Sequence, residues 1–193
     1  VYPNPELKPE TSVNLGGGIK QGLKLGGVAG YMDMVAFQQD FDRYVEFTFG
    51  QWGPDRSPAN LLGFGFKSIN TGGARITGTE FELAGKGLVG VVELRFLLGY
   101  THTLPVSTTP NEAYAQTVST TGAVQNVTYL STSSDTRNDI LKFRVQDLFR
   151  GDIGATWKRI SPGISVRYNS HVRNIDQAFI QIEQMGQLGE IGV

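Results

Sequence analysis

The sequence predicts an all-β fold, an antiparallel up-and-down meander of about six strands. Three observations support this: a composition suited to strands, apolar residues that recur at every second position, and connections that alternate between short and long. The 193 residues include 25 glycines and no cysteine, and only 18% are charged. No apolar run approaches the ~20 residues that a transmembrane helix needs. A disulfide framework, a thiolate zinc site and a cysteine nucleophile are excluded.

The expected strands follow one another along the whole chain. In five windows apolar side chains alternate with polar residues or glycine, which is typical of strands with one apolar and one polar face. From Gly90 to Tyr100, for example, Leu94 and Phe96 are set against Glu93 and Arg95. The expected strands are residues 11–20, 23–49, 61–84, 88–102, 138–158 and 161–172. The side chains expected on one side of the sheet are Val13, Leu15, Leu23, Leu25, Val92, Leu94, Phe96, Ile153, Trp157, Ile164 and Val166.

The connections between these strands alternate strictly in length. Tight turns are expected at Gln21-Gly22, across residues 84–87 and across residues 158–161. One long connection crosses residues 51–58, whose two prolines a central strand would not accept. The other covers residues 103–137. Ser and Thr account for 15 of the 37 residues in 101–137, so we expect a loop that faces outward, lies close to the ligand and is the most mobile part of the chain.

This asymmetry favours a larger transmembrane β-barrel, because such barrels have short periplasmic turns and longer extracellular loops. The apolar face would then meet lipid and the polar face would line the lumen. Tyr31, Tyr100 and Tyr168 fall late in upward strands and Trp157 at the bottom of a downward one, as interfacial girdles require. A soluble β-sandwich has the same alternation, and as the alternative it would make the chain a binding or adhesion module for glycan or protein.

Three segments resemble motifs of the barrels of TonB-dependent receptors. Residues 4–11 read N-P-E-L-K-P-E-T and resemble the N-P-x-L-K-P-E-T motif that opens a late strand of these barrels. Residues 70–80 are similar to the family segment N-x-x-x-A-R-x-x-G-x-E. Residues 165–170, followed by Asn-Ile-Asp at 174–176, are similar to a strand near the end of the same barrels. The motifs occur in the family order and span nearly the whole chain.

The resemblance implies an active transporter of the bacterial outer membrane, surrounded by outer-membrane lipid and energised by the TonB complex. Its cargo would be a scarce nutrient: an iron-siderophore complex, cobalamin or an oligosaccharide. Family members carry a plug domain and a barrel of 22 strands, which far exceeds 193 residues at ~10 residues per crossing. We therefore expect residues 1–193 to be an internal part of such a barrel, without the plug and the final strands. Contact with TonB would fall to parts of the parent chain outside this sequence.

Enzymatic, metal and nucleic-acid functions find no support in the sequence. His102 and His171 stand alone at expected strand ends, without the spacing of a catalytic or metal-ligating pair. Asp40, Asp42 and Glu46 lack the glycine-containing loop of a calcium hand and fit alternating polar positions of a strand. The formal net charge of −1 gives no basic excess for phosphate backbones. We expect no catalytic residue, no metal and no cofactor.

Candidate ligand contacts must come from the long connections and the polar face. Trp52, Tyr114 and Tyr129 could stack on a ligand from the connections. Arg95, Arg150 and Arg167 could line the lumen, where the family often places basic residues. The ordinary alternatives are an aromatic side chain folded back on its own hairpin, and an arginine paired across strands with Glu93 or Asp152.

Overall fold

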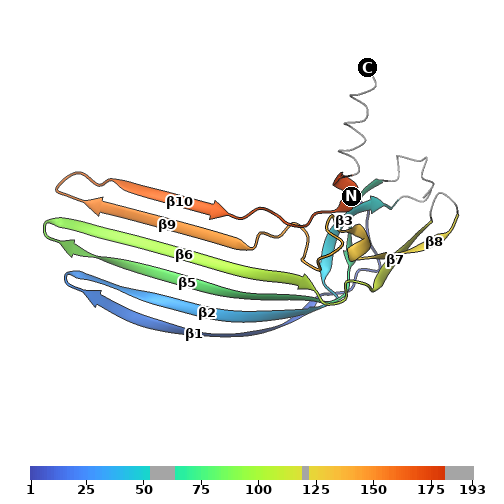
Figure 1. Ribbon diagram of the computed structural model, residues 1–193, viewed down its shortest axis with the longest axis horizontal. Coiled ribbons are helices and arrows are strands. Elements are labelled where there is room, and N and C mark those ends of the chain that lie inside the picture. The colour runs from blue at the N-terminus through green and yellow to red at the C-terminus, as the bar shows by residue number, and fades with distance from the viewer. Residues whose placement is uncertain (53–63, 119–121, 181–193) are drawn as a thin grey trace, which may run out of the picture.

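The computed structural model describes residues 1–52, 64–118 and 122–180. Six long antiparallel strands form a single-layered, curved sheet with the order β1-β2-β5-β6-β9-β10, and Figure 1 shows their turns at one end and smaller elements at the other. This confirms the predicted meander. The six strands are β1 (Thr11–Leu25), β2 (Val28–Asp42), β5 (Ala74–Val89), β6 (Val92–Ser107), β9 (Asp147–Thr156) and β10 (Gly163–Asn169).

Two of the three predicted tight turns are wrong in position. Gln21 and Gly22 lie inside β1, and residues 84–87 lie inside β5, so both hairpins extend further than expected. The turns fall instead at Gly26-Gly27 and Gly90-Val91, where Gly26 has a φ of 59° and Gly90 a φ of 61°. A two-residue hairpin loop with positive φ at its first position follows the twist of the flanking strands, and glycine adopts that φ without strain.

The shifted first turn changes which residues pair, although β1 and β2 pair directly as expected. Residues 11–20 lie opposite residues 33–42 rather than 23–31. The third turn is confirmed: Trp157 and Ile160 form an isolated bridge across Lys158, whose φ is 55°.

Pairing across the sheet fixes which side chains share a face, because directly opposite residues point to the same side. The residues expected on one side do share it, with Trp157 one residue beyond the end of β9. We call this side the apolar face and the other the polar face. The apolar face has no covering layer within the described residues, and Val13, Leu15 and Ile19 are each more than 70% exposed. A β-sandwich needs a second sheet on this face, and the described residues form none there.

An aromatic row marks one edge of the apolar face. Phe81, Tyr100, Phe149 and Tyr168 occupy consecutive register positions on β5, β6, β9 and β10. On β6 the apolar positions run from Val92 to Tyr100, about 27 Å at ~3.4 Å per residue. This matches the ~25 Å apolar band of a membrane barrel, so the row lies where an interfacial girdle belongs. The prediction that Tyr31 belongs to this girdle is wrong. The turn at Gly26-Gly27 places Tyr31 on the polar face, where it is hydrogen-bonded to Glu82.

Beyond the aromatic row the chain builds a small cap. The cap consists of residues 129–146 and 170–176 together with two hairpins and one short helix. These elements are β3 (Val45–Gln51) paired with β4 (Phe64–Asn70), β7 (Ala113–Val118) paired with β8 (Val124–Thr128), and the 3₁₀ helix η2 (Leu130–Thr132). Left-handed backbone at Arg43 (φ 54°) and Gly72 (φ 108°) separates β2 from β3 and β4 from β5.

The expectation that residues 103–137 form a loop is therefore wrong for part of this segment. β6 continues to Ser107, and β7, β8 and η2 follow within the same segment. Serine and threonine hydroxyls supply local hydrogen bonds here, as when Ser133 Oγ donates to the carbonyl oxygen of Tyr129 at 2.9 Å. The expected strand 138–158 also begins later, at Asp147, because residues 140–142 turn inward into the core. The long connection at 51–58 lies mostly outside the described residues.

Leu98 and Leu97 are neighbours on β6 whose side chains point to opposite faces of the sheet. They form a matched pair for testing which face contacts lipid. Leu98 lies in the apolar band, and Leu97 lies on the polar face opposite Asp152. We expect Leu98→Lys to destabilise a membrane-embedded barrel by ~2–4 kcal/mol, because its charge would face hydrocarbon, and Leu97→Lys to have a much smaller effect. Urea unfolding of the full receptor in lipid vesicles measures both. Equal effects would contradict the assigned faces.

Candidate ligand-binding site

The cap packs against the polar face of the sheet. Phe41 and Ile76, both on that face, pack against the buried cluster of Tyr44, Ala74, Tyr129 and Leu141. In this cluster Tyr129 and Leu141 are each only 1% exposed. The cap therefore leans over the side that a barrel would enclose, at the end away from the short turns.

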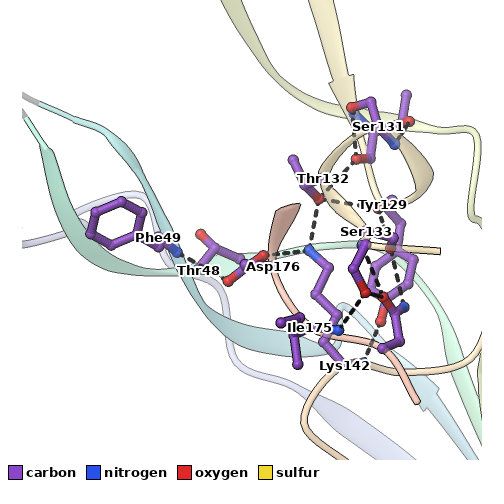
Figure 2. A network of polar contacts seen from close by, with 12 residues as sticks. Thr48, Phe49, Tyr129, Ser131, Thr132, Ser133, Lys142, Ile175 and Asp176 are labelled. Atoms are coloured by element: carbon purple, nitrogen blue, oxygen red, sulfur yellow. Dashed lines mark hydrogen bonds and ion pairs between the residues drawn. The ribbon is translucent and has the colours of Figure 1, made fainter. Parts of the chain in front are cut away.

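A buried ion pair ties the segments of the cap together (Figure 2). Lys142 Nζ lies 2.7 Å from Asp176 Oδ1, with both side chains at most 3% exposed. Lys142 Nζ also donates to Thr132 Oγ1 at 2.7 Å, and Asp176 Oδ2 accepts the backbone N–H of Phe49 at 3.3 Å. A paired and fully hydrogen-bonded charge can be buried, whereas an unpaired one is costly. This pair thus connects β3, η2 and two irregular segments.

Asn174 links the same segments through its amide. Its Nδ2 donates to Ile140 O at 2.6 Å and to Ser133 Oγ at 3.2 Å, and its Oδ1 accepts from both the backbone N–H and the hydroxyl of Ser134. The side chain is 1% exposed, and all its polar atoms are used. Asn174 and Asp176 belong to the third segment that resembles the receptor family, residues 165–170 and 174–176. The side chains of this segment therefore hold the chain after β10 to the rest of the cap.

The first two segments that resemble the receptor family, residues 4–11 and 70–80, meet along β4, whereas Asp176 contacts β3. Asn70 Oδ1 accepts the backbone N–H of Lys8 at 2.9 Å, and Asn70 Nδ2 donates to Lys8 O at 3.0 Å and to Arg43 O at 2.7 Å. Asn4 Nδ2 donates to Ser68 O at 2.9 Å, and Glu10 Oε2 accepts the backbone N–H of Val45 at 2.8 Å. The N-terminal segment is thereby fastened along β4, next to the left-handed residue Arg43.

A polar cleft of about 770 Å³ opens between this N-terminal segment, β4 and the start of β7. Trp52 and Tyr114, two predicted ligand residues, both line it. The Trp52 indole N–H is buried and has no acceptor among the described residues, and Lys67 Nζ lies 5.4 Å from the centre of the Trp52 ring system. Tyr114 OH lies 3.0 Å from Thr132 Oγ1, and burial raises the pKa of Tyr114 to about 12.

The other predicted ligand residues lie elsewhere. Tyr129 belongs to the buried core, where its OH donates to Ile140 O at 3.2 Å and accepts the backbone N–H of Lys142 at 2.7 Å. Its pKa is raised, mainly by burial. Arg95, Arg150 and Arg167 all lie on the polar face, which would be the lumen wall. These arginines and Tyr129 therefore lie outside the cleft.

Two groups of interacting side chains were not foreseen from the sequence. Glu46 Oε2 is buried without a hydrogen-bond partner, beside Lys142 and Asp176. Burial raises the Glu46 pKa to about 7, although the charge of Lys142 partly offsets it. On the apolar face His102 lies opposite Asp147 with Nδ1 2.8 Å from Oδ1, and Tyr100 OH donates to the same oxygen at 2.7 Å. The strand register brings His102 and Asp147 together, and the packing of the cap brings Glu46 beside Lys142 and Asp176. The sequence shows neither.

No group of three or more carboxylate or histidine side chains in the described ranges is placed to hold a metal ion. Within the same ranges no helix has the length and apolarity to cross a membrane.

The two-faced sheet, the aromatic row and the cap at the end away from the short turns define the wall of a transmembrane β-barrel. The family model described as "TonB dependent receptor-like, beta-barrel" matches residues 1–181, and the chain belongs to this family. The family resides in the bacterial outer membrane and transports nutrients with energy from TonB; it is a family of transporters rather than enzymes. No curated protein and no solved structure matches the chain.

Removing one partner of the buried ion pair should unfold the cap. Asp176→Ala would leave the charge of Lys142 buried and unpaired, at a cost of ~3–5 kcal/mol. The double variant Lys142→Met/Asp176→Leu should lose much less, because no unpaired charge remains. Urea unfolding followed by limited proteolysis of the cap compares them. A double variant as unstable as Asp176→Ala would contradict the role assigned to the pair.

Glu46 should make the stability of the cap depend on pH. Its pKa of about 7 in the folded protein lies above its ordinary value of 4.5, so ionisation disfavours the folded state. This cost is absent below pH 4.5 and complete above pH 7, up to about 3 kcal/mol. Stability should therefore rise as the pH falls from 8 to 5, and Glu46→Gln should flatten the change.

Denaturant titrations of the cap at pH 5 and pH 8 measure this effect. Glu112→Gln, a change in an exposed glutamate of the cleft, serves as the control and should retain the wild-type profile. The same pH profile in wild type and Glu46→Gln would remove Glu46 as the cause.

Proposed function

We propose that residues 1–193 form an arc of a larger barrel that takes up a scarce nutrient, and that the cleft beside Trp52 binds this nutrient at the extracellular mouth. Family membership supports TonB-dependent outer-membrane transport in general. The observation that carries the cleft assignment is the buried indole N–H of Trp52, which has no acceptor among the described residues. Such a donor favours a polar ligand that supplies the missing acceptor.

The edges of the sheet support an arc rather than a closed barrel. β1 and β10 are at opposite ends of the strand order, and each has one partner within the described residues. Unpaired strand edges are costly in a membrane, because lipid offers no hydrogen bonds to the backbone. Both edges would pair with further strands of the parent protein.

The lining of the cleft favours an oligosaccharide among the nutrients that this family takes up. Trp52 and Tyr114 offer aromatic rings, and Gln116 contributes an amide side chain. The charged residues of the lining balance in formal charge, with three acidic and three basic side chains: Glu6, Asp42, Glu112, Lys8, Arg43 and Lys67. An uncharged ligand rich in hydroxyl groups fits this balance better than an anionic iron-siderophore complex or the large corrin of cobalamin.

Trp52→Ala in the full receptor tests the cleft. We expect at least a tenfold weaker binding of the best ligand from a panel of labelled oligosaccharides, because stacking and the indole hydrogen bond are both lost. Trp157→Ala, a change at the other end of the sheet, is the matched control and should bind normally. Cells that take up a ferric siderophore or cobalamin through this receptor, but no oligosaccharide, would contradict the substrate class.

A further inference from the structure

A single hydroxyl group connects the ligand cleft with the buried ion pair of the cap. Tyr114 lines the cleft, and its OH lies 3.0 Å from Thr132 Oγ1. Lys142 Nζ donates to the same Thr132 oxygen at 2.7 Å and to Asp176 Oδ1 at 2.7 Å, and Figure 2 shows both contacts of the ammonium group. A change in the ion pair can therefore reach the cleft through two hydrogen bonds.

Thr132 anchors Tyr114 by accepting a hydrogen bond from its hydroxyl group. The Thr132 hydroxyl carries one proton, for which two backbone acceptors are in reach, Thr128 O at 3.2 Å and Tyr129 O at 3.1 Å. The two lone pairs of Thr132 Oγ1 are then left to accept from Lys142 and from Tyr114. The Tyr114 hydroxyl makes no other hydrogen bond within residues 1–52, 64–118 and 122–180, so this contact holds the outer end of the ring.

Glu46 is the group that can disturb this arrangement. Its Oε2 is buried, has no hydrogen-bond partner in the described part of the chain, and lies beside Lys142 and Asp176. The Lys142 ammonium has three N–H donors, of which Thr132 and Asp176 take two. An ionised Glu46 carboxylate attracts Lys142 and accepts hydrogen bonds more strongly than the neutral hydroxyl of Thr132 does. A neutral Glu46 does not compete in this way.

The groups that face Glu46 come from β7 and from residues 129–146 and 170–176. They comprise two cations, one anion and two phenols: Lys142, Arg144, Asp176, Tyr114 and Tyr129. Each cation already has a partner, since Lys142 is paired with Asp176 and Arg144 Nη2 donates to Tyr44 OH at 2.8 Å. Burial therefore outweighs the attraction of these cations and raises the Glu46 pKa to about 7. The charge of Glu46 thus changes close to neutral pH.

We propose that Glu46 regulates the ligand cleft, because its charge decides whether the positioning residues Lys142 and Thr132 hold Tyr114 in place. With Glu46 neutral, Lys142 stays bonded to Thr132 and the cleft keeps the shape described above. With Glu46 ionised, Lys142 moves toward the carboxylate, Thr132 loses the charged donor that fixes its hydroxyl, and Tyr114 is held less firmly. The cleft therefore binds its ligand more tightly at acidic pH, and ligand binding raises the proton affinity of Glu46 by the same factor. This inference rests on the proposed function of the cleft.

Fluorine NMR of the full receptor in lipid nanodiscs tests the coupling without a ligand. 3-Fluorotyrosine in place of Tyr114 keeps the hydroxyl group, and its resonance should titrate with a midpoint near pH 7. The titration should be absent in Glu46→Gln and in Thr132→Val, and it should be retained in Thr132→Ser, which keeps the hydroxyl. Glu93→Gln, the same change in an exposed glutamate near the short turns, is the matched control and should keep the wild-type titration. Heat-modifiable migration in gels confirms that each variant is assembled.

Binding measurements separate a failure of this inference from a failure of the proposed function. The labelled oligosaccharide that binds best in the panel should bind about fivefold more tightly at pH 5 than at pH 8 in the wild type, and equally at both pH values in Glu46→Gln. Binding that depends on Trp52 but not on pH overturns the inference and leaves the cleft assignment intact.

Binding of no oligosaccharide at either pH contradicts the proposed substrate class, and the fluorine titration then decides the inference alone. A titration that is absent in the wild type, or that persists in Glu46→Gln or in Thr132→Val, overturns it.

Discussion

The structure depends on one constraint: an unbroken antiparallel register across six strands, in which every second side chain faces the same side. Because the hairpins of β1–β2 and β5–β6 close through two-residue turns, the register passes from strand to strand without a slip. A slip of one residue would bring Lys86 and Arg95 onto the apolar face and Leu94 and Phe96 onto the polar face. The apolar face and the aromatic row both follow from this register.

The cap shows why the family motifs contain the residues they do. Asn70 and Glu10 satisfy backbone groups just before β5 and after β2, and Asn174 and Asp176 satisfy buried polar groups of the cap after β10. These side chains replace the backbone pairing that ends at the top of the sheet. The motifs thus hold the cap over the polar face, beside the polar cleft and the buried Glu46.

The sequence predicted what depends on local periodicity and missed what depends on pairing. Alternation identified the apolar face and the polar positions of Arg95, Arg150 and Arg167, since a period of two needs no knowledge of neighbours. The sequence did not identify the turn at Gly26-Gly27, because Gln21-Gly22 suits a tight turn equally well. Only the pairing of Leu25 with Val28 excludes a turn at Gln21-Gly22. Tyr129 was predicted to contact a ligand because its burial depends on Tyr44 and Ala74, which are distant in sequence.

The central claim is that the apolar face contacts lipid up to the aromatic row. Because the chain has no cysteine, a single spin label can be placed at each position from 92 to 104 on β6 in an otherwise cysteine-free receptor in vesicles. Accessibility to oxygen and to a water-soluble nickel complex then reports lipid and water at each site. We predict high oxygen accessibility at even positions from 92 to 100, and nickel accessibility from 102 onward on the same face. Nickel accessibility at positions 94, 96 and 98 would contradict the claim.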